Sequence, residues 1–263
     1  MAIKQSVGKD GHNEPVDVKV IQAALNLSQT DQFQLQHKLD VDGIGGKNTV
    51  AAVEAFQAQI VGMQSPDGRV DPGGRTLQKL HSVLSRGLSE DAFLAVMAYG
   101  SVNRVASYFP LFDSALPNYQ IDTPLRIAHF LAQVGHESLS LHYTSEIASG
   151  AAYEGRKDLG NTQPGDGERF KGRGLIQITG RNNYKEYSEY SGVDFLKAGN
   201  ETLIATDPKY SLDVSLWFWQ SRELNTLADQ DDLRAITRRV NGGYNGLEDR
   251  RAYLQRAKFF LVA

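Results

Sequence analysis

Two glutamates, Glu137 and Glu146, lie nine residues apart in the stretch AHFLAQVGHESLSLHYTSE. Hydrolysis of a glycosidic bond needs a proton donor for the leaving oxygen, and a second group that activates water or stabilises the sugar cation. Two carboxylates in a polar, hydroxyl-rich groove can supply both functions. The pair therefore suggests glycoside hydrolysis as the chemistry of this chain.

The segment before Glu137 is expected to be a helix. Thr123-Pro124 is a typical helix start, with threonine at the N-cap and proline at the first helical position. An apolar stripe at helical spacing follows, formed by Ile127, Phe130, Leu131 and Val134. In partly dry surroundings a carboxyl stays protonated, which would suit Glu137 as the acid. A plain surface glutamate in the last helical turn fits the residues equally well.

The spacing of the two glutamates constrains where this helix ends. In a continuous helix, nine residues span about two and a half turns, so the carboxylates would point to opposite sides. We therefore expect the helix to end near Ser140. A carboxylate separation of roughly 6.5–9.5 Å would leave room for a water molecule and would predict inversion at the anomeric carbon.

A metal site is not expected at this pair. His136 and His142 are six residues apart, whereas the zinc-protease motif needs two histidines four apart on one helical face. We expect His136 to pack, or to orient Glu137 by hydrogen bonding. No metal and no cofactor are predicted.

A second motif, RFKGRGLIQITGRNNY, covers residues 169–184. Residues 174–179 alternate in a way that predicts an extended strand, with Ile176 and Ile178 toward the core and Gln177 and Thr179 toward the cleft. Thr179 could hold the attacking water, although its β-propensity explains it equally well. A phosphate loop is disfavoured, because the third glycine is missing. The side chains of this motif predicted to contact substrate are Gln177, Asn183 and Tyr184.

Three further features lie near the C-terminus. Asn241 stands where glycines end a predicted helix, which is ordinary C-cap chemistry but would also let its amide enter a groove. Trp217 and Trp219 could stack on sugars, but two tryptophans in an apolar helix favour the core. Arg250 and Arg251 are, by default, a solvated face.

Composition excludes several classes. The chain has 263 residues, 41% apolar and 22% charged, which indicates a globular fold. The net charge of −3 gives no basic stripe for nucleic acid. Cysteine is absent, and no apolar run reaches the roughly 18 residues of a membrane span. No signal peptide is visible at the N-terminus, so we expect the protein to be made in the cytoplasm without membrane insertion. We also expect a monomer.

The first part of the chain contains a weak repeat. Asp42-Gly43 to Thr49 resembles Asp67-Gly68 to Thr76, and in each a glycine-rich turn precedes an apolar-periodic segment. We expect three short helices, with the threonines as candidate caps and Gly45-Gly46 and Gly73-Gly74 in left-handed turns. This part is similar to the type-1 peptidoglycan-binding domain on the evidence of VIQAALN, the DG..GG..T turn and VAAVEAFQ.

The remainder of the chain is expected to be mainly α. The stretch LHSVLSRGL is the predicted boundary between two domains, residues 1–82 and 88–263, each with its own core. Gly150 to Gly180 predicts loops with one short hairpin. Helices are expected over Ser89–Ala98, Leu212–Leu224, Leu233–Val240 and Leu247–Leu261.

Five separated motifs in the second domain, HFLAQVGHES, the second glutamate, GRGLIQITGRNNY, VNGG and DRRAYLQR, resemble glycoside hydrolase family 19 in order. The resemblance implies an inverting hydrolase with a lysozyme-like, α-rich fold. It implies Glu137 as general acid, Glu146 as base or stabiliser and Thr179 as the residue that positions water. The substrate-binding positions implied are Gln177, Asn183 and Asn241, and Arg250 would tether the second carboxylate. Plant-type chitinases place their second glutamate in a longer, disulfide-supported segment that this chain lacks.

The whole layout resembles that of a modular bacteriophage endolysin. This predicts a muramidase that cleaves peptidoglycan between N-acetylmuramic acid and N-acetylglucosamine, after release from the host cytoplasm through a holin lesion. Two alternatives stay open: a chitinase on the same scaffold, and a wall-binding protein with an inactive hydrolase half.

Overall fold

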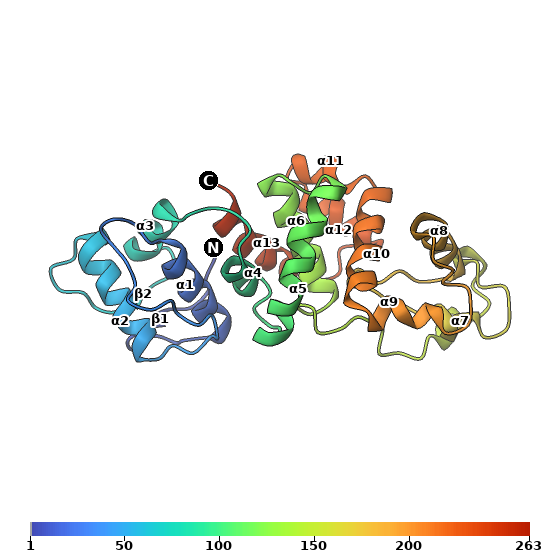
Figure 1. Cartoon of the computed structure of the whole chain (residues 1–263), viewed down its shortest axis with the longest axis horizontal. Coiled ribbons are helices and arrows are strands. Elements are labelled where there is room, and N and C mark those ends of the chain that lie inside the picture. Colours follow the sequence, from blue (N-terminus) through green and yellow to red (C-terminus); the bar gives the residue numbers. More distant parts are fainter. Residues whose placement is uncertain (1) are drawn as a thin grey trace.

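The computed structural model describes residues 2–263 as an elongated, mainly helical molecule (Figure 1). An N-terminal module lies at one end, a bundle of helices occupies the middle, and a smaller lobe lies at the other end. The mainly α fold class predicted from the sequence is confirmed. Within residues 2–263, every helix is too short or too polar to cross a bilayer.

The N-terminal module contains three α-helices, as predicted, and a two-stranded sheet that was not predicted. The strands pair antiparallel, with Val7 opposite Val70. The elements are β1 (Val7–Gly8), α1 (Pro15–Leu27), α2 (Lys47–Phe56), the π-helical turn η1 (Gln57–Val61), β2 (Arg69–Val70) and α3 (Arg75–Val83).

A buried glutamine explains the first copy of the repeat. Gln22 on α1 is 3% exposed. Its amide nitrogen donates to Asp42 Oδ1 at 2.8 Å and to Thr49 Oγ1 at 3.3 Å, and its oxygen accepts from the Gly43 backbone at 2.9 Å. The Asp-Gly turn is thus folded around one amide, with Gly43 at φ +84°.

The second copy repeats this arrangement. Gln57, also fully buried, donates to Asp67 Oδ1 at 2.6 Å and to Thr76 Oγ1 at 3.2 Å, and accepts from Gly68 at 2.9 Å. The threonines of both copies therefore hold glutamines and do not cap helices. The N-caps of α2 and α3 are Gly46 and Gly74, which have negative φ, so the left-handed conformation predicted at these two glycines is wrong. Gly73, with φ +70°, has the predicted left-handed conformation.

The middle bundle holds the long helices. Ser89 and Thr123 cap α4 and α6 as predicted, accepting from the backbone of Ala92 and Arg126. The elements are α4 (Glu90–Val96), α5 (Val102–Ala115), η2 (Leu116–Tyr119), α6 (Pro124–Glu137), α10 (Pro208–Ser221), α11 (Leu224–Asp229), α12 (Leu233–Asn241) and α13 (Leu247–Leu261).

Helix α10 starts four residues before the predicted Leu212, because Asp207 caps it and Pro208 takes the first helical position. Its two tryptophans belong to the core, as predicted: Trp217 is 6% and Trp219 0% exposed.

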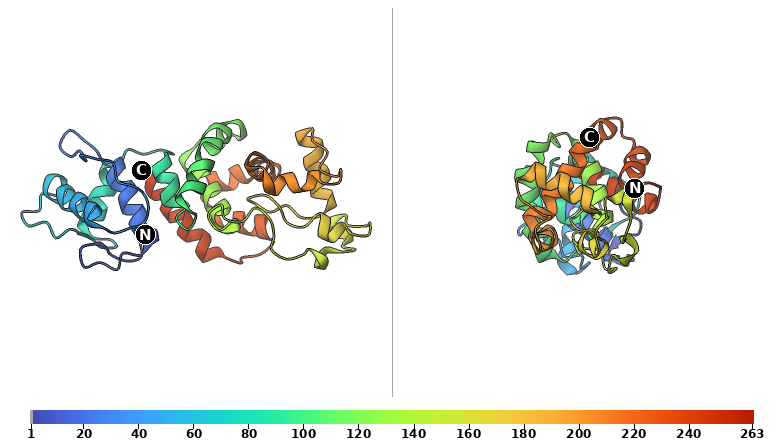
Figure 2. Two further views of the ribbon diagram at one scale, coloured as in Figure 1. Left: turned by 60° about the horizontal axis from the view of Figure 1, so that its bottom comes forward. Right: turned by 90° about the vertical axis from the view of Figure 1, so that its right-hand side faces the viewer.

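The far lobe contains short elements joined by loops: η3 (Ala151–Tyr153), η4 (Lys157–Leu159), α7 (Asp166–Arg169), α8 (Arg181–Ser191), η5 (Asn200–Thr202) and α9 (Leu203–Thr206). The left view of Figure 2 shows this lobe at the end of the molecule opposite the N-terminal module. A small apolar cluster that includes Phe170, Tyr187 and Trp217 fills the lobe.

The predicted strand over residues 174–179 is wrong. The segment is a tight turn closed by two backbone hydrogen bonds between Arg173 and Ile178, of 3.2 and 3.0 Å. Leu175 and Ile176 are both buried, so the side chains do not alternate. Gly174 takes φ +97°, which makes the reversal possible.

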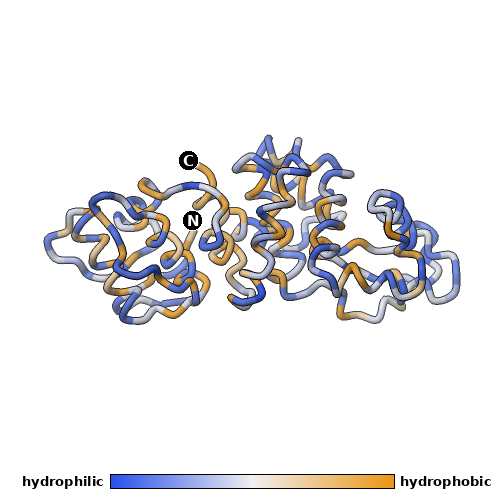
Figure 3. Tube along the Cα trace, viewed as in Figure 1, coloured by the Kyte–Doolittle hydropathy of each residue, from blue (hydrophilic) through white to orange (hydrophobic). Residues whose placement is uncertain are grey.

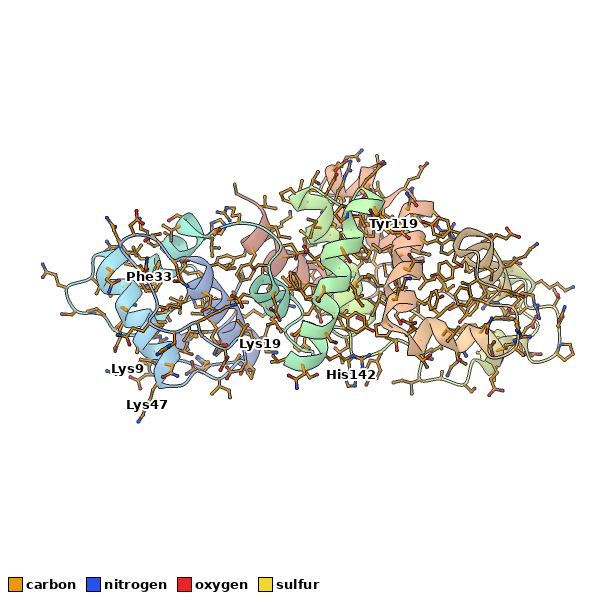
Figure 4. All side chains as sticks on the ribbon, in the orientation of Figure 1. Lys9, Lys19, Phe33, Lys47, Tyr119 and His142 are labelled. Carbon is orange, nitrogen blue, oxygen red and sulfur yellow. The ribbon has the colours of Figure 1, made fainter. Side chains whose placement is uncertain are left out.

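The two predicted domains do not have separate cores. One apolar cluster runs from the N-terminal module into the middle bundle, where α1 packs on α4. Figure 3 shows apolar stretches gathered where the module meets the bundle. Lys19, labelled in Figure 4, is buried at this junction and donates to the carbonyls of Ala98 (2.9 Å) and Gly100 (3.2 Å).

Candidate functional site

The chain reverses immediately after Glu137, which is the last residue of α6. Leu139, Ser140 and Leu141 take φ of +47°, +54° and +69°, a conformation that ends a helix. Ser140 Oγ lies 2.8 Å from the Tyr253 hydroxyl on α13, which anchors the reversal. The prediction that the helix ends near Ser140 is confirmed.

Glu137 is held by a buried arginine. Its side chain is 22% exposed, and Oε1 forms an ion pair with Arg250 Nη2, whereas Arg250 is 0% exposed. Arg250 Nη1 donates to Gln133 Oε1 at 2.5 Å. Among residues 2–263, Glu137 Oε1 is the carboxylate oxygen that accepts a hydrogen bond, and Oε2 accepts none. Two predictions for Arg250 are therefore wrong, since it is not a solvated residue and its carboxylate partner is Glu137 instead of Glu146.

His136 does not orient Glu137. Its Nδ1 lies 2.6 Å from Asp249 Oδ2 on α13, and this hydrogen bond lowers the pKa of Asp249. His142 is exposed (Figure 4) and its ring packs edge-on against Tyr143 at 4.5 Å. Residues 2–263 contain no cluster of three or more histidine, aspartate or glutamate side chains arranged to hold a metal ion.

Glu146 is fixed by the loop that contains the second motif. Its Oε1 accepts from the Tyr153 hydroxyl at 3.1 Å, and its Oε2 from the Gly172 backbone at 3.2 Å. The Glu146 backbone nitrogen donates to Gly172 O at 2.9 Å. Burial raises the pKa of Tyr153, and the charge of Glu146 adds to it, so this hydroxyl stays a donor to the carboxylate at neutral pH.

Gly172 brings Glu146 and Gln177 together. A Cβ added at Gly172 would lie 2.8 Å from Gln177 Oε1 and 3.3 Å from Glu146 Oε2. No larger residue fits between these two side chains without moving one of them. The amide of Gln177 therefore lies beside the carboxylate of Glu146.

Of the other predicted residues, Thr179, Asn183 and Asn241 are at least partly exposed, whereas Tyr184 is buried. Thr179 and Asn183 are half-buried, and Asn183 Nδ2 donates to Thr179 O at 2.7 Å. Asn241 is exposed at the end of α12. Tyr184, predicted to bind substrate, is 0% exposed, and its hydroxyl donates to Lys171 O at 2.7 Å. It supports the loop from beneath and cannot touch a ligand.

The sequence interpretation missed three supporting side chains: Gln133, Tyr153 and Asp249. Only Gln133 left a usable signal, because it precedes Glu137 by four residues and so shares its helical face. The contacts of Tyr153 and Asp249 depend on how distant segments meet.

Residues 91–232, just over half of the chain, match the family model of glycoside hydrolase family 19, described as chitinase class I. The chain belongs to this family. Residues 15–80 match a putative peptidoglycan-binding domain. The protein therefore joins an N-terminal peptidoglycan-binding domain to a family 19 glycoside hydrolase domain.

Curated relatives agree with this assignment. A family 19 domain-containing protein from Haemophilus influenzae is 36% identical over 108 residues, 40% of this chain and 49% of that protein. An endochitinase from Arabidopsis thaliana is 37% identical over 117 residues, 44% of this chain and 39% of that protein. The chain thus spans less than half the length of these relatives.

Solved structures share the fold. Chitinase C from Streptomyces griseus aligns with a TM-score of 0.51 at 23% identity, over 65% of this chain and 91% of that chain. A class IV chitinase from Zea mays gives the same TM-score and identity, over 65% and 90%.

Proposed function

We propose that this protein is an inverting muramidase that cleaves peptidoglycan between N-acetylmuramic acid and N-acetylglucosamine. The observation that carries the proposal is the union of a peptidoglycan-binding domain with a family 19 hydrolase domain in one continuous core. A module that holds the wall polymer raises the concentration of that polymer at the neighbouring site.

In the proposed mechanism, Glu137 donates a proton from its free Oε2 to the glycosidic oxygen. Arg250 holds Oε1, so the donor oxygen has a fixed direction. Glu146 accepts a proton from the attacking water, and Tyr153 and Gly172 keep its carboxylate in place. Thr179 positions that water, and Gln177, Asn183 and Asn241 bind the sugar substituents. Attack from the face opposite the leaving group would invert the anomeric carbon.

The acid assignment is tested with Glu137→Gln and Glu146→Gln. Loss of a general acid or base typically costs roughly 10²–10⁴ in rate, and we expect losses of this size in lysis of outer-membrane-permeabilised cells. Glu186→Gln, an exposed glutamate on α8, is the matched control and should lyse at the wild-type rate. Undiminished lysis by Glu137→Gln would show that Glu137 is not the acid.

A chitinase is the second candidate, because the relatives of this chain include endochitinases. Mass spectrometry separates the two activities. A muramidase releases muropeptides with N-acetylmuramic acid at the reducing end, whereas a chitinase cleaves N-acetylglucosamine oligomers and leaves peptidoglycan intact. Rapid cleavage of chitin oligomers without muropeptide release would favour the chitinase.

We propose that the wall polymer binds in a hollow of about 690 Å³ on the N-terminal module. Residues 34–40 and the start of α2 line it, including the exposed Lys47 and Asn48. Amide and ammonium groups suit the hydroxyls, amides and carboxylates of peptidoglycan. Lys47→Ala with Asn48→Ala should weaken co-sedimentation with purified sacculi. Lys9→Ala, on the same module but not among the residues that line the hollow, should not.

We also propose that the protein acts as a phage endolysin, released from the host cytoplasm onto the wall. The combination of wall-binding and hydrolase domains supports this role. Expression in a bacterial host should cause lysis only when a holin is co-expressed. Lysis without a holin would contradict the proposed route.

A further inference from the structure

A row of polar side chains runs along α6, and its first two members are buried. His129, Gln133 and Glu137 follow one another at intervals of four residues, so they share the face that packs against α13. Figure 1 shows the two helices side by side in the middle bundle. A polar row in a helix interface is costly unless its members are hydrogen-bonded.

The last two members of the row share one guanidinium. Gln133 is 0% exposed, and its Oε1 accepts from Arg250 Nη1 at 2.5 Å, while Arg250 Nη2 pairs with Glu137. Because a guanidinium is planar and rigid, fixing one side of it at Gln133 fixes the direction of the other side. The orientation of Glu137 therefore depends on which atom Gln133 presents to Arg250.

His129 can decide that orientation. The ring is 0% exposed, and Nε2 lies 2.8 Å from Asp231 Oδ1, so Nε2 carries the proton and donates. Burial lowers the pKa of His129, and Asp231 opposes this shift with a smaller effect. The ring is thus neutral near pH 7, with Nδ1 as a bare acceptor. Lys258 pairs with the other oxygen of Asp231 and holds that carboxylate.

Two buried atoms in this row have complementary hydrogen-bonding roles. His129 Nδ1 is an acceptor without a partner among residues 2–263, and Gln133 Nε2 is a donor without one. They belong to side chains one helical turn apart on the same face. A change of rotamer, or one bridging water, is needed to join the two atoms.

We propose that a hydrogen-bond chain runs Asp231–His129–Gln133–Arg250–Glu137, and that Gln133 and His129 are positioning residues for the acid. His129 accepts from Gln133 Nε2, which turns the amide oxygen toward Arg250. With the amide reversed, two donors would face each other and Arg250 would lose its anchor. This inference rests on the proposed role of Glu137.

The first test compares two buried glutamines. Gln133→Met keeps the side-chain length but removes both hydrogen bonds, and we expect kcat on solubilised peptidoglycan fragments to fall roughly 10- to 100-fold, as misplacement of a reacting group does. KM should stay within about twofold, because positioning acts on the chemical step. Gln57→Met is the control, because it removes the contacts of an equally buried glutamine to Asp67, Thr76 and Gly68, remote from Glu137. It should lower Tm at least as much and leave kcat unchanged.

A double-mutant cycle tests the link to His129. His129→Phe should lower kcat in the wild-type background and have little further effect in Gln133→Met. Independent losses that multiply in the double variant would overturn the chain, as would an unchanged kcat in both single variants.

A measurement without activity separates this inference from the proposed function. In full-length protein, ¹⁵N NMR should resolve the Arg250 guanidinium nitrogens as a rotationally restricted group, and Gln133→Met should average them. If Glu137→Gln keeps wild-type kcat, the acid assignment fails, but the NMR comparison still decides whether Gln133 holds Arg250. Identical Arg250 spectra in wild type and Gln133→Met would refute the positioning role.

Discussion

Arg250 and Glu137 differ in their access to solvent, and the difference matters for both stability and chemistry. The guanidinium is completely buried, whereas the carboxylate is 22% exposed. A buried cation without its partners costs several kcal/mol, so the protein must keep both acceptors on Arg250. The same contacts engage one glutamate oxygen and leave the other without a hydrogen bond among residues 2–263.

Replacing Arg250 with lysine keeps the charge but loses the geometry. A single ammonium cannot reproduce the two directed contacts to Gln133 and Glu137. We expect Arg250→Lys to lower kcat/KM at least tenfold and to cost about 1–3 kcal/mol of unfolding free energy. The neighbouring Arg251 is exposed and pairs with the exposed Glu248, so Arg251→Lys is the control. Equal behaviour of the two variants in turbidity and denaturation assays would contradict this account.

Sequence predicted those features of the fold that depend on the position of residues along the chain. The end of α6 between the two glutamates follows from their spacing and from the serine-rich stretch after Glu137. Arg250 and Tyr184 were misjudged, because their types permit either a surface or a buried role. Burial depends on which helix or loop packs above them, and one sequence contains no direct measure of this.

At the scale of elements, the close packing of α6 on α13 depends on Gly135. A Cβ there would lie 2.5 Å from two ring carbons of Tyr253. Gly135→Ala should therefore destabilise the protein by about 1–3 kcal/mol through overpacking, although alanine alone favours a helix by about 1 kcal/mol. Urea unfolding measures the change. Gly243→Ala, where a Cβ meets open space, should change stability by less than about 0.5 kcal/mol.

The far lobe is fastened by an ion pair that gives it a defined pH dependence. Arg181 Nη2 lies 2.5 Å from Asp166 Oδ1, and this hydrogen bond lowers the pKa of Asp166 below its ordinary 3.8. The unfolded chain therefore takes up the proton first as pH falls. The stabilisation is present above pH 3.8 and is lost as pH drops through the folded-state pKa.

Asp166→Asn should accordingly flatten the dependence of unfolding free energy on pH between about 4 and 2. Denaturation at a series of acidic pH values measures this slope. Asp158→Asn removes an exposed pair with Arg156 and should alter the slope much less, because solvent screens it. An unaltered slope in Asp166→Asn would mean that the pair does not contribute.

Element boundaries were predictable where capping chemistry is local. Thr123-Pro124 marked the start of α6 correctly, and Asp207-Pro208 carries the same signal for α10 although the predicted start was Leu212. The turn at residues 174–179 was not predictable from alternation. Its apolar residues are buried on both sides, by α10 and by the far lobe, so a strand and a buried turn have the same pattern.

At the scale of the whole molecule, the N-terminal module is docked, not tethered. Tethered domains meet through small polar contacts, but here α1 packs on α4 within one continuous apolar cluster. Asn26 donates to Asp91 across the junction at 3.3 Å, and Gly87 N donates to Phe260 O at 3.3 Å. The hollow proposed to bind the wall polymer thus keeps a fixed orientation toward Glu137 and Glu146.

Docking of this kind predicts one cooperative unfolding transition. Differential scanning calorimetry of the full chain should show a single peak whose calorimetric and van't Hoff enthalpies agree. Lys19 is the sharpest probe, because it is buried at the junction and burial lowers its pKa against the opposing charge of Asp42. Lys19→Ala removes both contacts to the Ala98 and Gly100 carbonyls and should lower the whole transition. Two peaks, with only the module's peak moved by Lys19→Ala, would show that the halves unfold independently.

A docked module also means that deleting residues 1–85 would expose the apolar faces of α4 and α13, so point variants in the hollow are the proper test of wall binding.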